Sequence, residues 1–449
     1  MNFLGKIEKR FGAAQGTIFA VAAAFIVKGI GALYKIPLYN ILGDYATGVY
    51  GMVFPLYALL LCVSCSGIPS AMTKMISDGY TPEKVVKKAF AVFLPICVFF
   101  SVALFLFAEK IATFQGNSDA SSLYKSIAPS IFFVGCIAVF RGYFQGLSNM
   151  RVTALSQIFE QGVRAVIGLI GAYLLPISQL GKAIIAVSAI TFSELFALVY
   201  CIIVYKKNGR KENIDTKEVS LKNLFSYVVP LTLSAVLIPL SGVAEGFIAM
   251  RSLKNLGDTG TAYYGLYVGA TETIISLPAA VLYPVASGFL PKMNDENIAS
   301  RCILISTVGS FVAAAFVFFF PNFIITVLFN GVAYKSVLQN MLKIASLNIL
   351  LLPILQTTSV IMLSKGKQKR SFFNNAIGCV IKIAVCALLI NNAEIHVFAL
   401  TISDICCYFV ALTLNLIYII GIKRKRGSIS NDYVGGAGNG KGRLVVKSV

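Results

Sequence analysis

Long apolar runs are the feature of this sequence that most restricts its fold. Twelve predominantly apolar stretches follow one another along the chain, and none alternates polar with apolar residues. A helix needs about 20 residues to cross a bilayer, and in lipid only helices and closed barrels satisfy every backbone group. Because period-two alternation is missing, helices are expected rather than barrel strands. The sequence predicts an all-α polytopic membrane protein with about 12 transmembrane helices, at residues 15–37, 48–72, 89–108, 127–147, 153–175, 183–205, 224–250, 263–290, 302–320, 340–363, 371–390 and 396–421.

Composition excludes the main soluble classes. Apolar residues make up 57% of the 449 residues and charged residues only 13%, about half the usual charged share. A soluble chain of this size could not hide so much apolar surface. An ordinary cytosolic enzyme, a disordered protein and a small disulfide scaffold are therefore excluded.

The basic residues indicate an orientation. The chain holds 39 Lys and Arg against 19 Asp and Glu, a net charge of +20. With the amino terminus inside, most of the loop Lys and Arg fall on inner segments, notably 74–88, 206–222, 365–370 and 423–426. This bias follows the positive-inside rule and argues against a nucleic-acid patch. We therefore expect a multi-pass protein of the bacterial cytoplasmic membrane with both termini cytoplasmic.

The two halves of the chain contain a repeat. Residues 40–44 (NILGD) precede a Tyr-Gly pair at 50–51, and residues 255–258 (NLGD) precede a Tyr-Gly pair at 264–265, an offset of 214. The alternative is chance similarity of two Gly-rich loops. Six spans separate the copies, so the halves would be parallel repeats. This predicts two parallel six-helix lobes, with the boundaries 1–14 (cytoplasmic amino terminus), 15–205 (N-lobe), 206–223 (cytoplasmic linker), 224–421 (C-lobe) and 422–449 (disordered cytoplasmic tail).

Neither a catalytic set nor a metal-binding pattern is visible. All ten Cys lie in apolar runs, and the single His, His396, has no Cys partner at metal spacing. The pair at Cys62 and Cys65 is interpreted as helix packing. We therefore expect no enzyme, cofactor or metal centre. Two facing lobes favour a transporter that rocks around a central cavity.

Several segments resemble a known family. They are residues 16–17, 28–38, 42–50 and 66–69 in the first half, and 256–258, 264–265, 277–278 and 290–291 in the second. They resemble the stage V sporulation protein B / polysaccharide biosynthesis group, whose superfamily includes MurJ lipid II flippases and MATE (multidrug and toxic compound extrusion) transporters. The resemblance extends to about Ile420. It implies a flippase for a polyprenyl-diphosphate-linked saccharide, such as a lipid II-like peptidoglycan precursor or a polysaccharide precursor, working without ATP hydrolysis.

The sequence departs from that family in two respects. Sporulation and MurJ-type members usually have fourteen spans, and the extra pair forms part of a lipid-facing groove. Without helices 13 and 14, a glycolipid other than lipid II remains a candidate substrate. Family members also tend to have Arg where Lys28 stands, and Lys keeps the charge but loses the bidentate fork for phosphate.

Charged residues inside the spans are candidate site residues, because each costs at least ~2.5 kcal/mol on insertion scales. Basic residues predominate in the N-lobe and acidic residues in the C-lobe, which suggests an anion site and a cation site. A diphosphate head group would be bound by converging cations, for which the candidates are Lys28, Lys35, Arg141, Arg164 and Lys382. Alternatives remain open: Lys35 snorkelling, Arg141 anchoring to lipid phosphate, and an internal Glu160–Arg164 pair.

The C-lobe candidates for coupling to Na⁺ or H⁺ are oxygen-bearing side chains. The resemblance implies a sodium site supplied by helices seven, eleven and twelve. The candidates are Glu245, Glu272, Asp404, Thr401 and Asn374. Glu272 lies between two threonines and suits a proton site. The alternative for these acids is a protonated, hydrogen-bonded carboxyl group.

Three functions follow from this interpretation. The first is a flippase whose partners are a polyprenyl-diphosphate glycolipid, membrane lipids and, in the cell, cell-wall synthesis proteins. The second is a cation-coupled exporter of amphipathic cationic drugs of the MATE type. The third is a scaffold for cell-wall synthesis that transports nothing. A net positive N-lobe favours the first, because it attracts an anionic lipid head group and repels cationic drugs.

Overall fold

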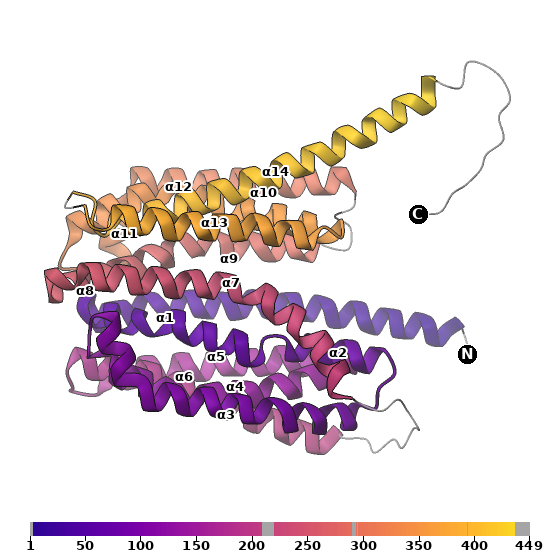
Figure 1. The fold of residues 1–449 in the computed structure, drawn as a ribbon, viewed down its shortest axis with the longest axis horizontal. Helices are drawn as coiled ribbons and strands as arrows, with labels where there is room; N and C mark the ends of the chain where they lie inside the picture. Colours follow the sequence, from indigo (N-terminus) through magenta and orange to yellow (C-terminus); the bar gives the residue numbers. More distant parts are fainter. Residues whose placement is uncertain (1–2, 209–219, 290–292, 294, 393, 436–449) are drawn as a thin grey trace.

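The computed structural model describes residues 3–208, 220–289, 293, 295–392 and 394–435 (Figure 1). Within these ranges the secondary structure is entirely helical. Among the described residues, ten helical stretches are long and apolar enough to cross a membrane. The first of them, Gly29–Ser77, covers both parts of α1 and α2, and α5, which carries Glu160 and Arg164, is not among the ten. The predicted all-α membrane fold is confirmed, and the predicted spans fall mainly on helices.

The N-lobe is formed by the first six helices. Their bounds are α1 (Phe3–Cys65), α2 (Ile68–Ser77), α3 (Pro82–Gln115), α4 (Ala120–Gly146), α5 (Met150–Leu174) and α6 (Gln179–Asn208). Two helices make up α1 and meet at Gly43, whose backbone is not helical. The predicted span 48–72 is not continuous, because α1 ends at Cys65 and α2 begins at Ile68.

The C-lobe is formed by the remaining elements. They are α7 (Leu221–Leu253), η1 (Lys254–Leu256), α8 (Asp258–Gly265), η2 (Leu266–Thr271), α9 (Glu272–Gly288), α10 (Glu296–Phe319), α11 (Pro321–Leu328), α12 (Lys335–Ser364), α13 (Gln368–Leu389) and α14 (Phe398–Gly435). The last helix, α14, continues to Gly435, beyond residue 422 where the predicted disordered tail begins. Residues 436–449 lie outside the described part.

The helices are arranged in two layers with α1 and α7 between them (Figure 1). In the N-lobe, α3 packs on α4, and α6 packs on both α4 and α5. In the C-lobe, α12 packs on α10 and α14, and α13 packs on α14. The lobes meet where α1 contacts α7, α8 and α9. The described starts of α1 and α7 lie at the same end of the bundle, on the right of Figure 1.

The repeated Gly-Asp turns occupy equivalent places in the two lobes. Gly43 and Gly257 both have positive φ, at 73° and 58°. Each is followed by an aspartate that begins a helix, Asp44 in the second part of α1 and Asp258 in α8. Glycine suits this conformation because it has no Cβ. The local structure therefore agrees with the parallel repeat expected from the sequence.

Candidate functional site

A central cavity lies between the lobes. Its volume is about 1520 Å³ and its walls come from both lobes, including α1, α5, α7, α12 and α13. Sites for drug-sized ligands are commonly about 300–1,000 Å³, so this space is large enough for a bigger head group. The cavity reaches Gln368 and Lys369 at the start of α13. This is the end of the bundle for which the sequence predicts the cytoplasmic side.

The lobes are joined at the opposite end. The second part of α1 packs on α8 so closely that a Cβ at Gly48 would overlap the carbonyl oxygen of Thr261. The Asn117 side chain donates a hydrogen bond to Thr261 Oγ1 at 3.1 Å. The backbone N–H of Ala333 donates to Asp44 Oδ2 at 3.0 Å. Because these contacts connect the two lobes, they hold this end of the cavity closed.

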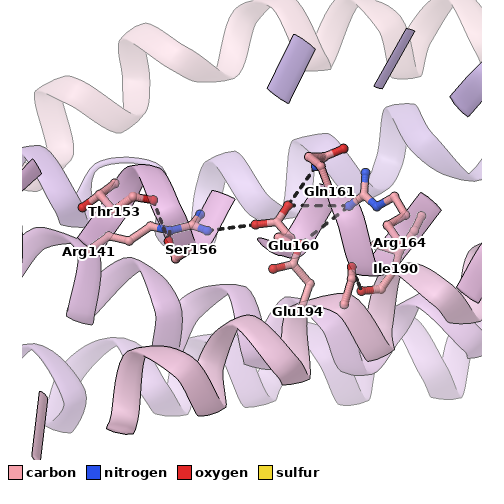
Figure 2. Close-up of polar contacts among 9 residues, drawn as sticks. Arg141, Thr153, Ser156, Glu160, Gln161, Arg164, Ile190 and Glu194 are labelled. Carbon is pink, nitrogen blue, oxygen red and sulfur yellow. Dashed lines mark hydrogen bonds and ion pairs between the residues drawn. The ribbon is translucent and has the colours of Figure 1, made fainter. Parts of the chain in front are cut away.

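The first charge cluster lies in the N-lobe, where α4, α5 and α6 meet (Figure 2). Arg141 donates to Glu160 Oε2 at 2.9 Å and to Ser156 Oγ at 2.9 Å. Arg141 is not part of the cavity wall. Two short contacts thus engage this arginine inside the lobe, away from the cavity wall.

Arg164 is placed differently in the same cluster, which we call the N-lobe cluster (Arg141, Glu160, Arg164 and Glu194). Figure 2 shows Glu160 between the two arginines. The Arg164 guanidinium lies 3.8 Å from Glu160 Oε1 and 3.7 Å from Glu194 Oε1. Its Nε is buried and has no hydrogen-bond partner, and its side chain lines the cavity. The expected Glu160–Arg164 pair forms, but loosely, and it leaves a donor beside the cavity.

Two candidate lysines, Lys28 and Lys35, belong to α1. Lys35 lines the cavity and is exposed, and among the described residues it makes no ion pair. Lys28 belongs to α1, but its side chain lies outside the described residues. The structure thus places Lys35 and Arg164 in the wall of one cavity, which Lys382 and Glu245 of the C-lobe also line.

The second charge cluster lies in the C-lobe and joins residues that the sequence had assigned to different sites. Lys382 Nζ lies 2.7 Å from Glu245 Oε2 and 2.7 Å from Asp404 Oδ1. Ser403 donates to Glu245 Oε1 at 3.0 Å, and Tyr267 donates to Asp404 Oδ2 at 2.6 Å. We call Lys382, Glu245 and Asp404 the C-lobe triad. The lysine expected to bind an anionic head group is therefore held by two carboxylates.

The other candidates for cation coupling are dispersed. Glu272 lines the cavity, and among the described residues it makes no ion pair. The Thr401 hydroxyl is buried and has no partner. Asn374 donates a hydrogen bond to Asn415 Oδ1 at 2.8 Å, and the Asn415 side chain donates in turn to Thr358 Oγ1 at 3.4 Å. Asn374 therefore belongs to a separate polar network. In the described part of the chain, no group of three His, Cys, Asp or Glu residues could hold a metal ion.

Sequence analysis missed two members of the second cluster, Ser403 and Tyr267. Ser403 is the immediate neighbour of Asp404 in α14, and Tyr267 follows the repeated Tyr-Gly pair in η2. Both signals are weak, because hydroxyl residues are common in membrane helices. Only the contacts across helices identify them.

Comparisons with known proteins agree with this architecture. Residues 13–290 match the sequence model of a family described as polysaccharide biosynthesis protein. Stage V sporulation protein B of Bacillus subtilis (strain 168) is 25% identical over 299 residues, which are 63% of this chain and 58% of the relative. The match thus spans less than two thirds of that relative's length.

Two solved structures share the fold. A multidrug resistance MATE family transporter of the MOP superfamily, in an inward-facing conformation, matches with a TM-score of 0.69 and 14% identity, covering 91% of this chain and 99% of that one. The lipid II flippase MurJ in an inward closed conformation matches with a TM-score of 0.69 and 15% identity, covering 90% of this chain and 87% of that one.

Proposed function

This chain belongs to the polysaccharide biosynthesis protein family, and we propose that it flips a polyprenyl-diphosphate-linked saccharide across the bacterial cytoplasmic membrane. It is a multi-pass membrane protein of the flippase and transporter type found in the MOP superfamily. Its relatives are transporters and flippases rather than enzymes. The proposal concerns the cargo, the side from which it enters and the residues that bind it.

The observation that carries the proposal is the state of the basic groups in the cavity wall. Lys35 makes no ion pair among the described residues, and Arg164 has a buried Nε without a partner. An unsatisfied buried donor costs roughly 1–3 kcal/mol, so an anion that reaches Arg164 recovers part of that cost. Guanidinium and ammonium groups bind phosphate oxygens strongly. A diphosphate would therefore supply the anionic partner that Lys35 and Arg164 lack.

The direction of entry follows from the ends of the cavity. One end is closed by the contacts of α1 with α8, whereas the cavity reaches Lys369 at the other. The basic turn at 365–370 would face the cytoplasm under the positive-inside rule. The head group would enter here from the inner leaflet, while the prenyl chain stays in lipid. Rocking of the lobes would then open the other end.

The test is flipping of a fluorescent polyprenyl diphosphate carrying one sugar, in proteoliposomes. We expect the wild type to flip it, and Lys35→Ala combined with Arg164→Ala to lose most of the activity. Lys125→Ala is the matched control, because Lys125 is an exposed lysine of α4 outside the cavity wall.

The rival functions give different results in the same vesicles. A MATE-type exporter would move an amphipathic cation such as ethidium and ignore the diphosphate lipid. A scaffold would move neither. Either result would overturn the proposed cargo.

A further inference from the structure

The C-lobe triad is a buried site in which one ammonium group lies between two carboxylates. Lys382 contacts one oxygen of Glu245 and one of Asp404. Ser403 and Tyr267 contact the remaining two. The two acids are only 5% and 3% exposed. The groups come from four elements, namely α7, η2, α13 and α14.

Two neighbouring buried carboxylates are stabilised by a cation that lies between them. A buried charge without a partner costs several kcal/mol, and the loss is largest when one member of an established pair is removed. Hard cations such as Na⁺ use the same carboxylate and hydroxyl oxygens. Here the ammonium group of Lys382 occupies that position at 2.7 Å from each acid.

We propose that Lys382 is a covalently attached, permanent cation of this site, and that the C-lobe triad therefore binds no exchangeable Na⁺. The ammonium lies between the two acids and engages an oxygen of each. It fills the space that an exchangeable cation shared by the same two oxygens would need. This inference is independent of the cargo.

The charge of the triad argues against head-group binding by Lys382. Two carboxylates and one ammonium leave the triad with an excess negative charge, which repels a diphosphate. Lys382 also connects α7, at the boundary between the lobes, with α13 and α14 of the C-lobe. It stabilises this helix contact without a dissociable ion. The triad itself then supplies no Na⁺ coupling to transport.

The test is thermal unfolding of the purified full-length protein in NaCl, KCl and choline chloride at equal ionic strength. The wild type should unfold at the same temperature in all three salts. Lys382→Ala should unfold at a lower temperature in choline and regain several degrees in NaCl, rising with the Na⁺ concentration as ligand linkage requires. Adding Asp404→Asn to Lys382→Ala should abolish the gain, because one ligand carboxylate is lost.

Two outcomes would overturn the inference. One is a saturable Na⁺ stabilisation of the wild type, and the other is a folded Lys382→Ala protein without any response to Na⁺. If Lys382→Ala does not fold, equilibrium binding of radioactive Na⁺ to the wild type decides, with no bound ion expected and one bound ion contradicting the inference. These measurements involve no transport, so their failure is distinct from failure of the proposed flippase function.

Discussion

The N-lobe cluster and the C-lobe triad both place charges inside membrane helices, but they satisfy those charges to different degrees. In the N-lobe, Arg164 lies 3.7 and 3.8 Å from its acidic neighbours and keeps an unpartnered Nε. In the C-lobe, Lys382 lies 2.7 Å from both of its acids. Both cations line the cavity, but the loosely paired one can exchange its partner for a ligand, whereas the tightly paired one contributes structure. On this account the N-lobe cluster binds the ligand, and the C-lobe triad stabilises the packing of the helices.

The largest effect should come from the C-lobe triad. Lys382→Met leaves two buried carboxylates without a cation, and we expect the free energy of unfolding to fall by about 3–5 kcal/mol in choline chloride. Chemical denaturation of the detergent-solubilised protein measures this change. Lys125→Met, an exposed change in α4, should stay within about 0.5 kcal/mol of the wild type. A Lys382→Met protein as stable as this control would remove the contrast between the clusters.

A smaller effect is expected from the N-lobe, and on binding rather than on stability. Arg164→Ala should weaken binding of a polyprenyl diphosphate at least ~10-fold, which corresponds to ~1.4 kcal/mol. Arg164→Lys keeps the charge without the planar fork and should lie between Arg164→Ala and the wild type. Lipid titration followed by thermal unfolding measures both variants. Equal affinity in all three proteins would mean that Arg164 does not contact the head group.

The smallest effect concerns the acids that share Arg164. Glu194→Gln removes one of its two negative neighbours while Glu160 keeps its contact with Arg141. The cluster then gains net positive charge, and we expect binding of the same lipid to tighten about threefold, or ~0.7 kcal/mol. Isothermal titration in detergent would detect it. Weaker binding would indicate instead that Glu194 is needed to hold Arg164 in place.

Much of the fold could be predicted from the sequence because lipid imposes few solutions. The apolar runs locate the helices, and the repeated Gly-Asp pairs at 43–44 and 257–258 begin equivalent helices. The break between Cys65 and Ile68 escaped prediction although Gly67 and Pro69 mark it, because the span was placed by its overall apolar character. The extension of α14 to Gly435 escaped for the opposite reason, since its residues are polar.

The charged residues of the site could also be found from the sequence, since each is costly in a membrane helix. Their pairing could not. Lys382 and Glu245 belong to helices far apart in the chain, and only the packing of α7 on α13 brings them together. The same holds for Arg141, which contacts α5 through Glu160 instead of lining the cavity. Sequence spacing revealed only the local Glu160–Arg164 pair.

The most direct test of a diphosphate site on the N-lobe wall is native mass spectrometry of the protein extracted gently from bacterial membranes. We expect a copurified polyprenyl-diphosphate saccharide on the wild type and on Lys125→Ala. The same lipid should be lost from the protein carrying both Lys35→Ala and Arg164→Ala. A wild type that carries only ordinary phospholipids, or a double variant that keeps the diphosphate lipid at the wild-type level, would contradict the account.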